Sequence, residues 1–134
     1  SLRGVRTLSH ADLDGDGLPE LLVADGWHYA YGEHGDARLM AHLGTDWTQT
    51  RPLAWLPQNY SIRDIDVETI RGRTAILLTG SHDVYLLTPD GLGWAQERLG
   101  KIDETGNAVF IKTQNGPAVA ISGQPVQYIE LALP

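Results

Sequence analysis

The sequence predicts an all-β protein in which one antiparallel unit of about four strands is repeated three times. Short apolar runs alternate with turns rich in Gly, Asp, Asn and Pro along most of the chain. A core of consecutive apolar residues recurs once in each unit. A glycine turn and then a tyrosine follow each of these cores. These three observations favour short paired strands throughout, so we treat the 134 residues as a single repetitive domain.

The first unit covers about residues 1–44 and ends at a glycine. Alternating residues before the acidic segment 12–20 form its first strand, and Leu21–Ala24 is a short apolar run typical of a buried strand. Asp25-Gly26 is a strong hairpin signal, and the aromatic segment after it favours a third strand. We expect four strands, over residues 1–9, 21–24, 27–31 and 37–43.

Residues 45–61 lack a clear strand period. Pro52 and Pro57 exclude a long helix here. Trp47 and Trp55 indicate that this segment packs against the domain. We therefore expect a packed connector between the first and second units.

The second and third units cover about residues 62–100 and 108–134. Ile62, Ile65, Val67 and Ile70 do not alternate cleanly, which predicts a β-bulge near Arg63-Asp64. The chain ends after three strands of the third unit, so the last unit lacks its outer strand. The expected strands cover residues 62–70, 74–79, 83–88, 94–99, 108–112, 118–122 and 126–131.

Two sets of landmarks indicate that the three units are copies of one another. The apolar cores that begin at Leu21, Ile76 and Val119 are separated by 55 and then 43 residues. The tyrosines Tyr29, Tyr85 and Tyr128 are separated by 56 and then 43 residues. Such periods in an all-β chain are typical of β-propeller blades. Three blades do not close a ring, so we expect either the terminal piece of a longer propeller or several chains that complete one together.

The segment Asp12-Leu13-Asp14-Gly15-Asp16-Gly17-Leu18-Pro19-Glu20 has the pattern of a loop that wraps a cation. Carboxylates at loop positions 1, 3, 5 and 9 supply hard oxygen ligands, and Gly17 at position 6 permits a sharp bend. The backbone carbonyl of Leu18 is the natural fifth protein ligand. The predicted metal ligands are therefore Asp12, Asp14, Asp16, Leu18 and Glu20.

An EF-hand shares only the first half of this pattern. Its position 12 requires a bidentate Glu, whereas Val23 stands there, and a short strand follows the loop where an EF-hand has a helix. A turn without metal is the alternative, although close carboxylates repel one another by about 1 kcal/mol per pair even in water. An all-oxygen cage on a flexible loop favours Ca²⁺ over Mg²⁺.

The loop and the strand after it have the pattern Asp-x-Asp-x-Asp-Gly-x-x-Glu followed by Leu-Leu-Val-Ala. This pattern resembles the calcium loop of the FG-GAP/VCBS repeat family, which includes the propellers of integrin α-subunits and many bacterial surface proteins. The resemblance covers about fifteen residues, and the Phe-Gly and Gly-Ala-Pro words of the family are absent. It implies that the loop joins the first two strands of a blade, with Asp12, Asp14, Asp16 and Glu20 as calcium ligands.

Composition excludes several classes of function. The net charge of −7 and the scattered basic residues argue against nucleic acid binding, and no apolar run is long enough to insert into a membrane. The absence of cysteine excludes disulfides and thiolate sites. A weak calcium loop favours an extracellular, periplasmic or cell-surface location, where calcium is abundant enough to fill it.

No pattern of catalytic residues is present, so we expect no enzymatic activity of this chain. The five histidines lack the spacing of a zinc site, and neither a nucleophile elbow nor a phosphate-binding loop occurs. Asp64, Asp66 and Glu68 alternate as on a solvated strand face, with a second metal site as the alternative. We expect a calcium-binding, non-catalytic propeller segment that contacts protein, matrix or glycan partners. Sugar binding through exposed tryptophans, or a share in a hydrolase whose catalytic groups lie elsewhere, are the alternatives.

Overall fold

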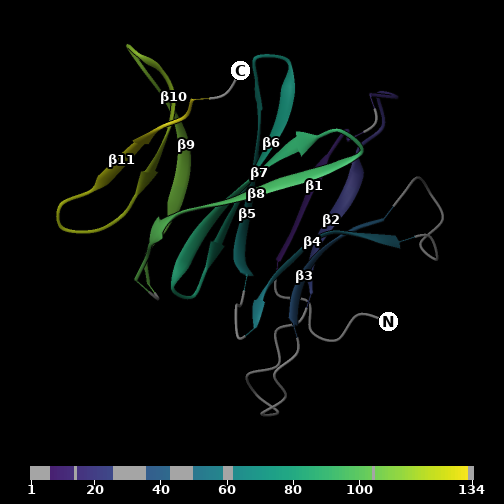
Figure 1. Ribbon diagram of the computed structural model, residues 1–134, viewed down its shortest axis with the longest axis horizontal. Helices are drawn as coiled ribbons and strands as arrows, with labels where there is room; N and C mark the ends of the chain where they lie inside the picture. The colour runs from purple at the N-terminus through teal and green to yellow at the C-terminus, as the bar shows by residue number, and fades with distance from the viewer. Residues whose placement is uncertain are drawn as a thin grey trace.

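The computed structural model describes residues 7–13, 15–25, 36–42, 50–58, 62–103 and 105–132. All regular structure in these residues is β-strand, arranged as three open antiparallel sheets in chain order. The sheets lie side by side in Figure 1, with the second in the middle. The predicted all-β class is confirmed, and the described residues contain eleven strands, although one of them, over residues 50–58, was not predicted.

The first sheet has the order β1-β2-β3-β4. Each strand pairs with the next one along the chain, so the sheet is a simple meander. Its strands are β1 (Thr7–Ala11), β2 (Glu20–Asp25), β3 (Asp36–His42) and β4 (Thr50–Gln58).

The prediction of a connector over residues 45–61 is wrong, because β4 occupies most of that segment. The strand predicted as the fourth, over 37–43, is instead the third in the sheet, and the one predicted over 27–31 lies outside the described residues. Pro52 and Pro57 do not prevent pairing, because β4 is an edge strand and a proline there need not donate to a neighbour. Register shifts in the β3–β4 ladder accompany this arrangement.

The second sheet has the order β5-β6-β7-β8 and follows its prediction closely. The predicted bulge is confirmed by a register shift between Ile62 and Asp64. Arg71 and Gly72 form the predicted turn with φ of 53° and 78°, the left-handed conformation of a tight hairpin. Its strands are β5 (Ile62–Ile70), β6 (Arg73–Gly80), β7 (Asp83–Asp90) and β8 (Gly93–Lys101).

The third sheet has three strands in the described residues, in the order β11-β10-β9. They are β9 (Ala108–Thr113), β10 (Gly116–Ile121) and β11 (Gln127–Glu130).

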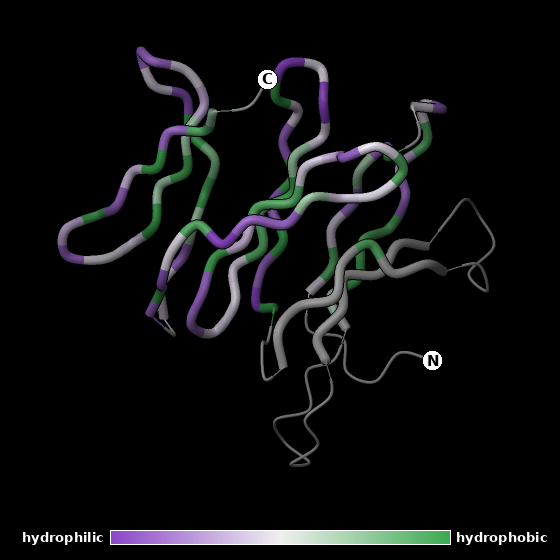
Figure 2. Tube along the Cα trace, viewed as in Figure 1, coloured by the Kyte–Doolittle hydropathy of each residue, from purple (hydrophilic) through white to green (hydrophobic). Residues whose placement is uncertain are grey.

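The middle sheet is buried on both faces. Ile76 and Leu78 of β6 point into a cluster shared with the first sheet, which we call the first junction. Ala75 and Leu77 of the same strand point into a second cluster shared with the third sheet, which we call the second junction. Figure 2 shows the resulting apolar centre. Alternate residues of one strand thus serve two interfaces, which explains why β6 is a continuous apolar run.

A polar clamp accompanies the apolar second junction. The guanidinium of Arg63 donates from Nε to the Gly80 carbonyl at 2.9 Å, and from Nη1 and Nη2 to the carbonyls of Gly106 and Asp103 at 3.0 Å each. Three carbonyls in two segments are thereby satisfied by one side chain. A side chain at residue 106 would not fit, because an added Cβ would lie 2.7 Å from Ser122 Oγ.

The repeat landmarks agree with the structure in one case and fail in the other. Val119 and Ile121 face the second sheet as Ile76 and Leu78 face the first, so the apolar cores of the second and third units lie in corresponding positions. The tyrosines are not, because Tyr85 is buried in the first junction while Tyr128 pairs with Ala120 on the opposite face of its sheet and is 68% exposed. Tyr29 lies outside the described residues.

Candidate metal centre

The acidic loop joins β1 to β2 at the end of their hairpin. Two glycines give it its shape, with φ of 78° at Gly15 and 87° at Gly17. These left-handed conformations are strained for any residue with a Cβ, so the loop requires glycine at both points. The predicted bend at Gly17 is confirmed.

Aspartate side chains fold the loop around themselves. The Asp12 carboxylate accepts from the Gly15 amide at 2.8 Å through Oδ1 and from the Gly17 amide at 2.9 Å through Oδ2. Asp16 Oδ1 accepts from the Leu18 amide at 2.8 Å. These bonds hold both carboxylates inside the loop and use only some of the about four acceptor positions that a carboxylate has.

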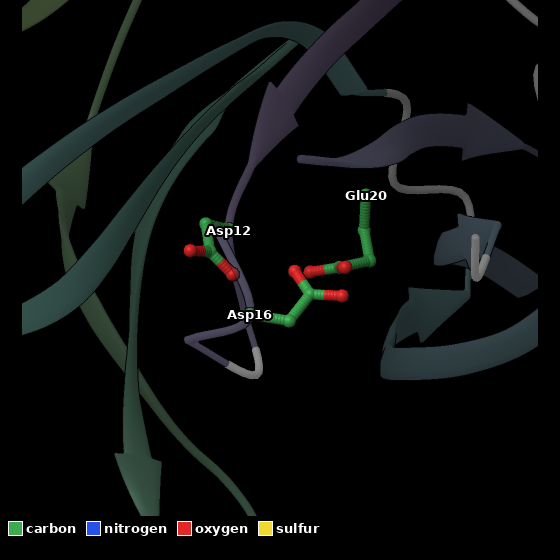
Figure 3. Close-up of side chains that lie close together, drawn as sticks. All are labelled: Asp12, Asp16 and Glu20. Atoms are coloured by element: carbon green, nitrogen blue, oxygen red, sulfur yellow. The ribbon is translucent and has the colours of Figure 1, made fainter. Parts of the chain in front are cut away.

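Three of the predicted ligands converge (Figure 3). Asp12, Asp16 and Glu20 each contribute one oxygen, and these three oxygens lie within 4.8 Å of one another. Two oxygens bound to the same calcium ion lie at most about 5 Å apart, because each calcium–oxygen distance is about 2.3–2.6 Å. The acidic triad could therefore hold a metal ion.

Glu20 differs from the two aspartates because it is 3% exposed. It shares a face of β2 with Leu22 and Ala24, and its register partner on β1 is Ala11, so its side chain lies on the side of the first junction. Its Oε2 accepts a hydrogen bond from the Leu13 amide. No basic side chain of the described residues forms an ion pair with it.

A buried carboxylate of this kind is costly unless its charge is offset, since one backbone amide replaces only part of its hydration. The neighbouring Asp12 and Asp16 add negative charge and increase that cost. A cation bound by the triad would offset it. The donor set, made only of carboxylate oxygens, fits a hard ion of the calcium or magnesium type.

The remaining predicted ligands stay predictions. Asp14 lies outside the described residues. Leu18 is described, and its amide donates to Asp16 while its side chain is 63% exposed. The role of its carbonyl as a ligand is not tested by these contacts.

Two contributors to the loop were missed by sequence reasoning. Gly15 bends the loop as strongly as Gly17, and the repeated Asp-Gly pair was the signal that could have found it. The Leu13 amide donates to the buried Glu20. Sequence reasoning could not find it, because every residue type except proline supplies a backbone N–H.

Other groups singled out by the sequence do not form such a cluster. Among the described residues, the acidic triad is the one group of three metal-binding side chains that converge. Asp64 and Glu68 are exposed on β5, and Asp66 Oδ2 accepts from the Phe110 amide at 3.5 Å instead. Trp94 packs against the first junction. Trp27 and Trp47, and the side chain of Trp55, lie outside the described part of the chain.

In comparisons with known proteins, the sequence matches no protein-family model, and no curated protein or solved structure is significantly similar to it. Within the described residues, no helix is long and apolar enough to cross a membrane.

Proposed function

We propose that the chain is a calcium-binding, non-catalytic scaffold built from propeller-like stacked sheets, belonging to a secreted or surface protein. Ca²⁺ would be held by Asp12, Asp16 and Glu20, with Asp14 and the Leu18 carbonyl completing the set. Further sheets, from a longer chain or from another copy, would extend the stack. Protein, matrix or glycan partners would contact the loops and outer surfaces.

The buried carboxylate of Glu20 is the observation that supports this proposal best. Exposed acids gather on many surfaces without a ligand, but an acid at 3% exposure, with two further carboxylates beside it, is unfavourable without a counter-charge. The loop glycines add support, because the backbone is already bent around the point where the oxygens meet.

The ion would act by stabilising the first junction. Glu20 belongs to β2 on the side where the first sheet packs on the second, so neutralising its charge favours the packed state. At millimolar calcium and a dissociation constant of about 10⁻⁴ to 10⁻³ M, binding adds about 0.5–2 kcal/mol to the free energy of unfolding. The scaffold would thus be most rigid where calcium is abundant.

Calorimetric titration of calcium into the wild type and Asp16→Asn tests the proposal. Asparagine keeps an oxygen that accepts from the Leu18 amide, so the variant removes charge with little change in loop shape. We expect one calcium per chain in the wild type and an affinity at least tenfold lower in the variant.

Asp90→Asn is the matched control, because Asp90 is an exposed acid at a turn end outside the triad. It should bind calcium as the wild type does. Equal melting temperatures of the wild type in calcium and in chelator, together with no heat of binding, would refute the proposal.

A further inference from the structure

The turn between β9 and β10 contains the dipeptide Asn115-Gly116. Gln114 and Asn115 form the turn, both residues are exposed, and Gly116 begins β10. The sequence has three asparagines, and Asn115 is the one that a glycine follows. An asparagine in this position can react with its own backbone, because the nitrogen of the next residue is held close to the side-chain amide.

Gly116 leaves this backbone nitrogen accessible. Its φ of 118° is a conformation that favours glycine, and a Cβ added there would meet no heavy atom within 4 Å. Gly116 and Thr113 form the last pair of the β9–β10 ladder, next to the turn. Opening this pair frees the Gly116 amide while the rest of the sheet stays folded, since the ends of hairpins open at low cost.

The reaction needs only these groups of the chain, together with hydroxide and water from solution. Hydroxide takes the proton of the Gly116 amide, and the nitrogen then attacks Cγ of Asn115. A bond forms between these two atoms, the bond from Cγ to Nδ2 breaks, and Nδ2 leaves as ammonia after taking a proton from water. Water then opens the cyclic imide at one or the other of its carbonyls, which gives aspartate or isoaspartate at residue 115.

The side chain of Asn115 also links the turn to β11. Its Nδ2 donates to Glu130 Oε1 at 3.1 Å. The backbone amide of Asn115 donates to Thr113 Oγ1 at 3.1 Å, and the Thr113 hydroxyl donates to the Gly116 carbonyl at 3.0 Å. Deamidation removes the Nδ2 donor and places a carboxylate opposite Glu130, so that an attractive contact becomes a repulsive one.

We propose that Asn115 is a site of spontaneous deamidation, and that the product loosens the contact between the β9–β10 turn and β11. The reaction adds a negative charge to a chain that is already acidic. It uses no residue of the acidic triad, so its outcome does not depend on whether the chain binds calcium.

Incubation of the full chain in mildly alkaline buffer, followed by peptide mapping with mass spectrometry, tests the site. The peptide that contains Asn115 should gain about 1 Da, because OH replaces NH2. Asn107 is the internal control, since the next residue, Ala108, carries a Cβ and is 1% exposed. Its conversion should be at least about tenfold slower.

Three results would overturn the assignment of this site. They are an unchanged mass of the Asn115 peptide, equal conversion of the two asparagines, and conversion of Asn115 in urea but not in the folded chain. The last result would show that the hairpin protects the asparagine.

The variant Asn115→Asp reproduces one product and tests its effect on the third sheet. Hydrogen exchange of the β11 amides that pair with β10 should accelerate by about fivefold, because a hydrogen bond is lost and like charges face each other. Adding Glu130→Gln should restore the wild-type rate, since the glutamine amide can donate to the new carboxylate.

Gln114→Glu is the matched control, because it adds the same charge at the neighbouring exposed residue of the same turn. It should leave the exchange of β11 unchanged. An equal acceleration by Gln114→Glu, or a failure of Glu130→Gln to reverse the effect of Asn115→Asp, would refute the proposed loosening.

Discussion

The two junctions of the middle sheet are built alike in their apolar parts and differently in their polar parts. Each is an apolar cluster, and alternate residues of β6 point into one cluster or the other. At the second junction, Arg63 satisfies three carbonyls, so its charge is surrounded by acceptors. At the first, Glu20 is buried, and among the described residues it has one backbone donor and two acidic neighbours.

This difference separates a junction whose charged group finds its partners within the described residues from one that, in our proposal, is completed by a bound cation. A cation surrounded by neutral carbonyls is close to satisfied. A carboxylate near two others is not, so the first junction should respond to calcium while the second should not. Variants at each junction can test this contrast.

The largest effect is expected from truncating the apolar parts, with Leu77→Ala at the second junction and Leu78→Ala at the first. Both side chains are fully buried neighbours in one strand, so each variant should lose about 3 kcal/mol of unfolding free energy. Urea denaturation in calcium and in chelator measures this. Only Leu78→Ala should also weaken calcium binding, and an equal weakening by Leu77→Ala would mean that the junctions are not independent.

Removing the clamp should have the next largest effect. Arg63→Met leaves the carbonyls of Gly80, Asp103 and Gly106 without this donor and should cost about 2 kcal/mol. Arg63→Lys should recover only part of the loss, since an ammonium group cannot reproduce the guanidinium fork. Denaturant midpoints should shift equally in calcium and in chelator, and a shift seen only in chelator would contradict the contrast.

A smaller effect is expected from neutralising Glu20. The wild type should gain about 0.5–2 kcal/mol on adding millimolar calcium, and Glu20→Gln should gain nothing. In chelator the variant should be as stable as the wild type or more stable by up to about 1 kcal/mol, because a buried amide costs less than a buried carboxylate. Thermal denaturation of both proteins measures this, with Glu97→Gln on exposed β8 as the control. A large loss of stability in chelator would show that the charge itself is needed.

The smallest effect is expected from an ion pair that spans neither junction. Arg98 and Asp83 meet at 2.7 Å on neighbouring strands of the second sheet, and the Arg98 side chain is 44% exposed. Solvent screens such pairs, so Arg98→Ala should change stability by less than about 0.5 kcal/mol, with or without calcium. Denaturant titration at this precision provides the baseline for the other variants.

Local patterns in the sequence were sufficient to predict most of the second and third sheets. The apolar runs of β6 and β10 and the uneven spacing of isoleucines in β5 specify strand, turn and bulge through their own side chains. In the first sheet, residues 45–61 were predicted as a connector because they lack a clear strand period, although an edge strand forms there and accepts Pro52 and Pro57. Whether a strand lies at an edge depends on its neighbours in space, which a local pattern does not contain.

The same distinction applies to the candidate site. The spacing of Asp12, Asp16 and Glu20 was enough to predict that they converge, because a nine-residue loop leaves little choice. The burial of Glu20 beside the second sheet was not predictable, since it depends on how two sheets pack. The tyrosine spacing suggested that Tyr128 corresponds to Tyr85, but the two tyrosines lie on different faces, because Tyr85 pairs with Leu78 whereas Tyr128 pairs with Ala120.

The double burial of β6 has a consequence for the order in which the molecule opens. Its amides sit between two other strands in the sheet, and its side chains are covered from above and below. Exchange of these hydrogens with solvent therefore requires global unfolding, whereas β4 and β11, at sheet edges, can fray alone. We therefore expect the edge strands to exchange their amide hydrogens first and β6 to exchange them last.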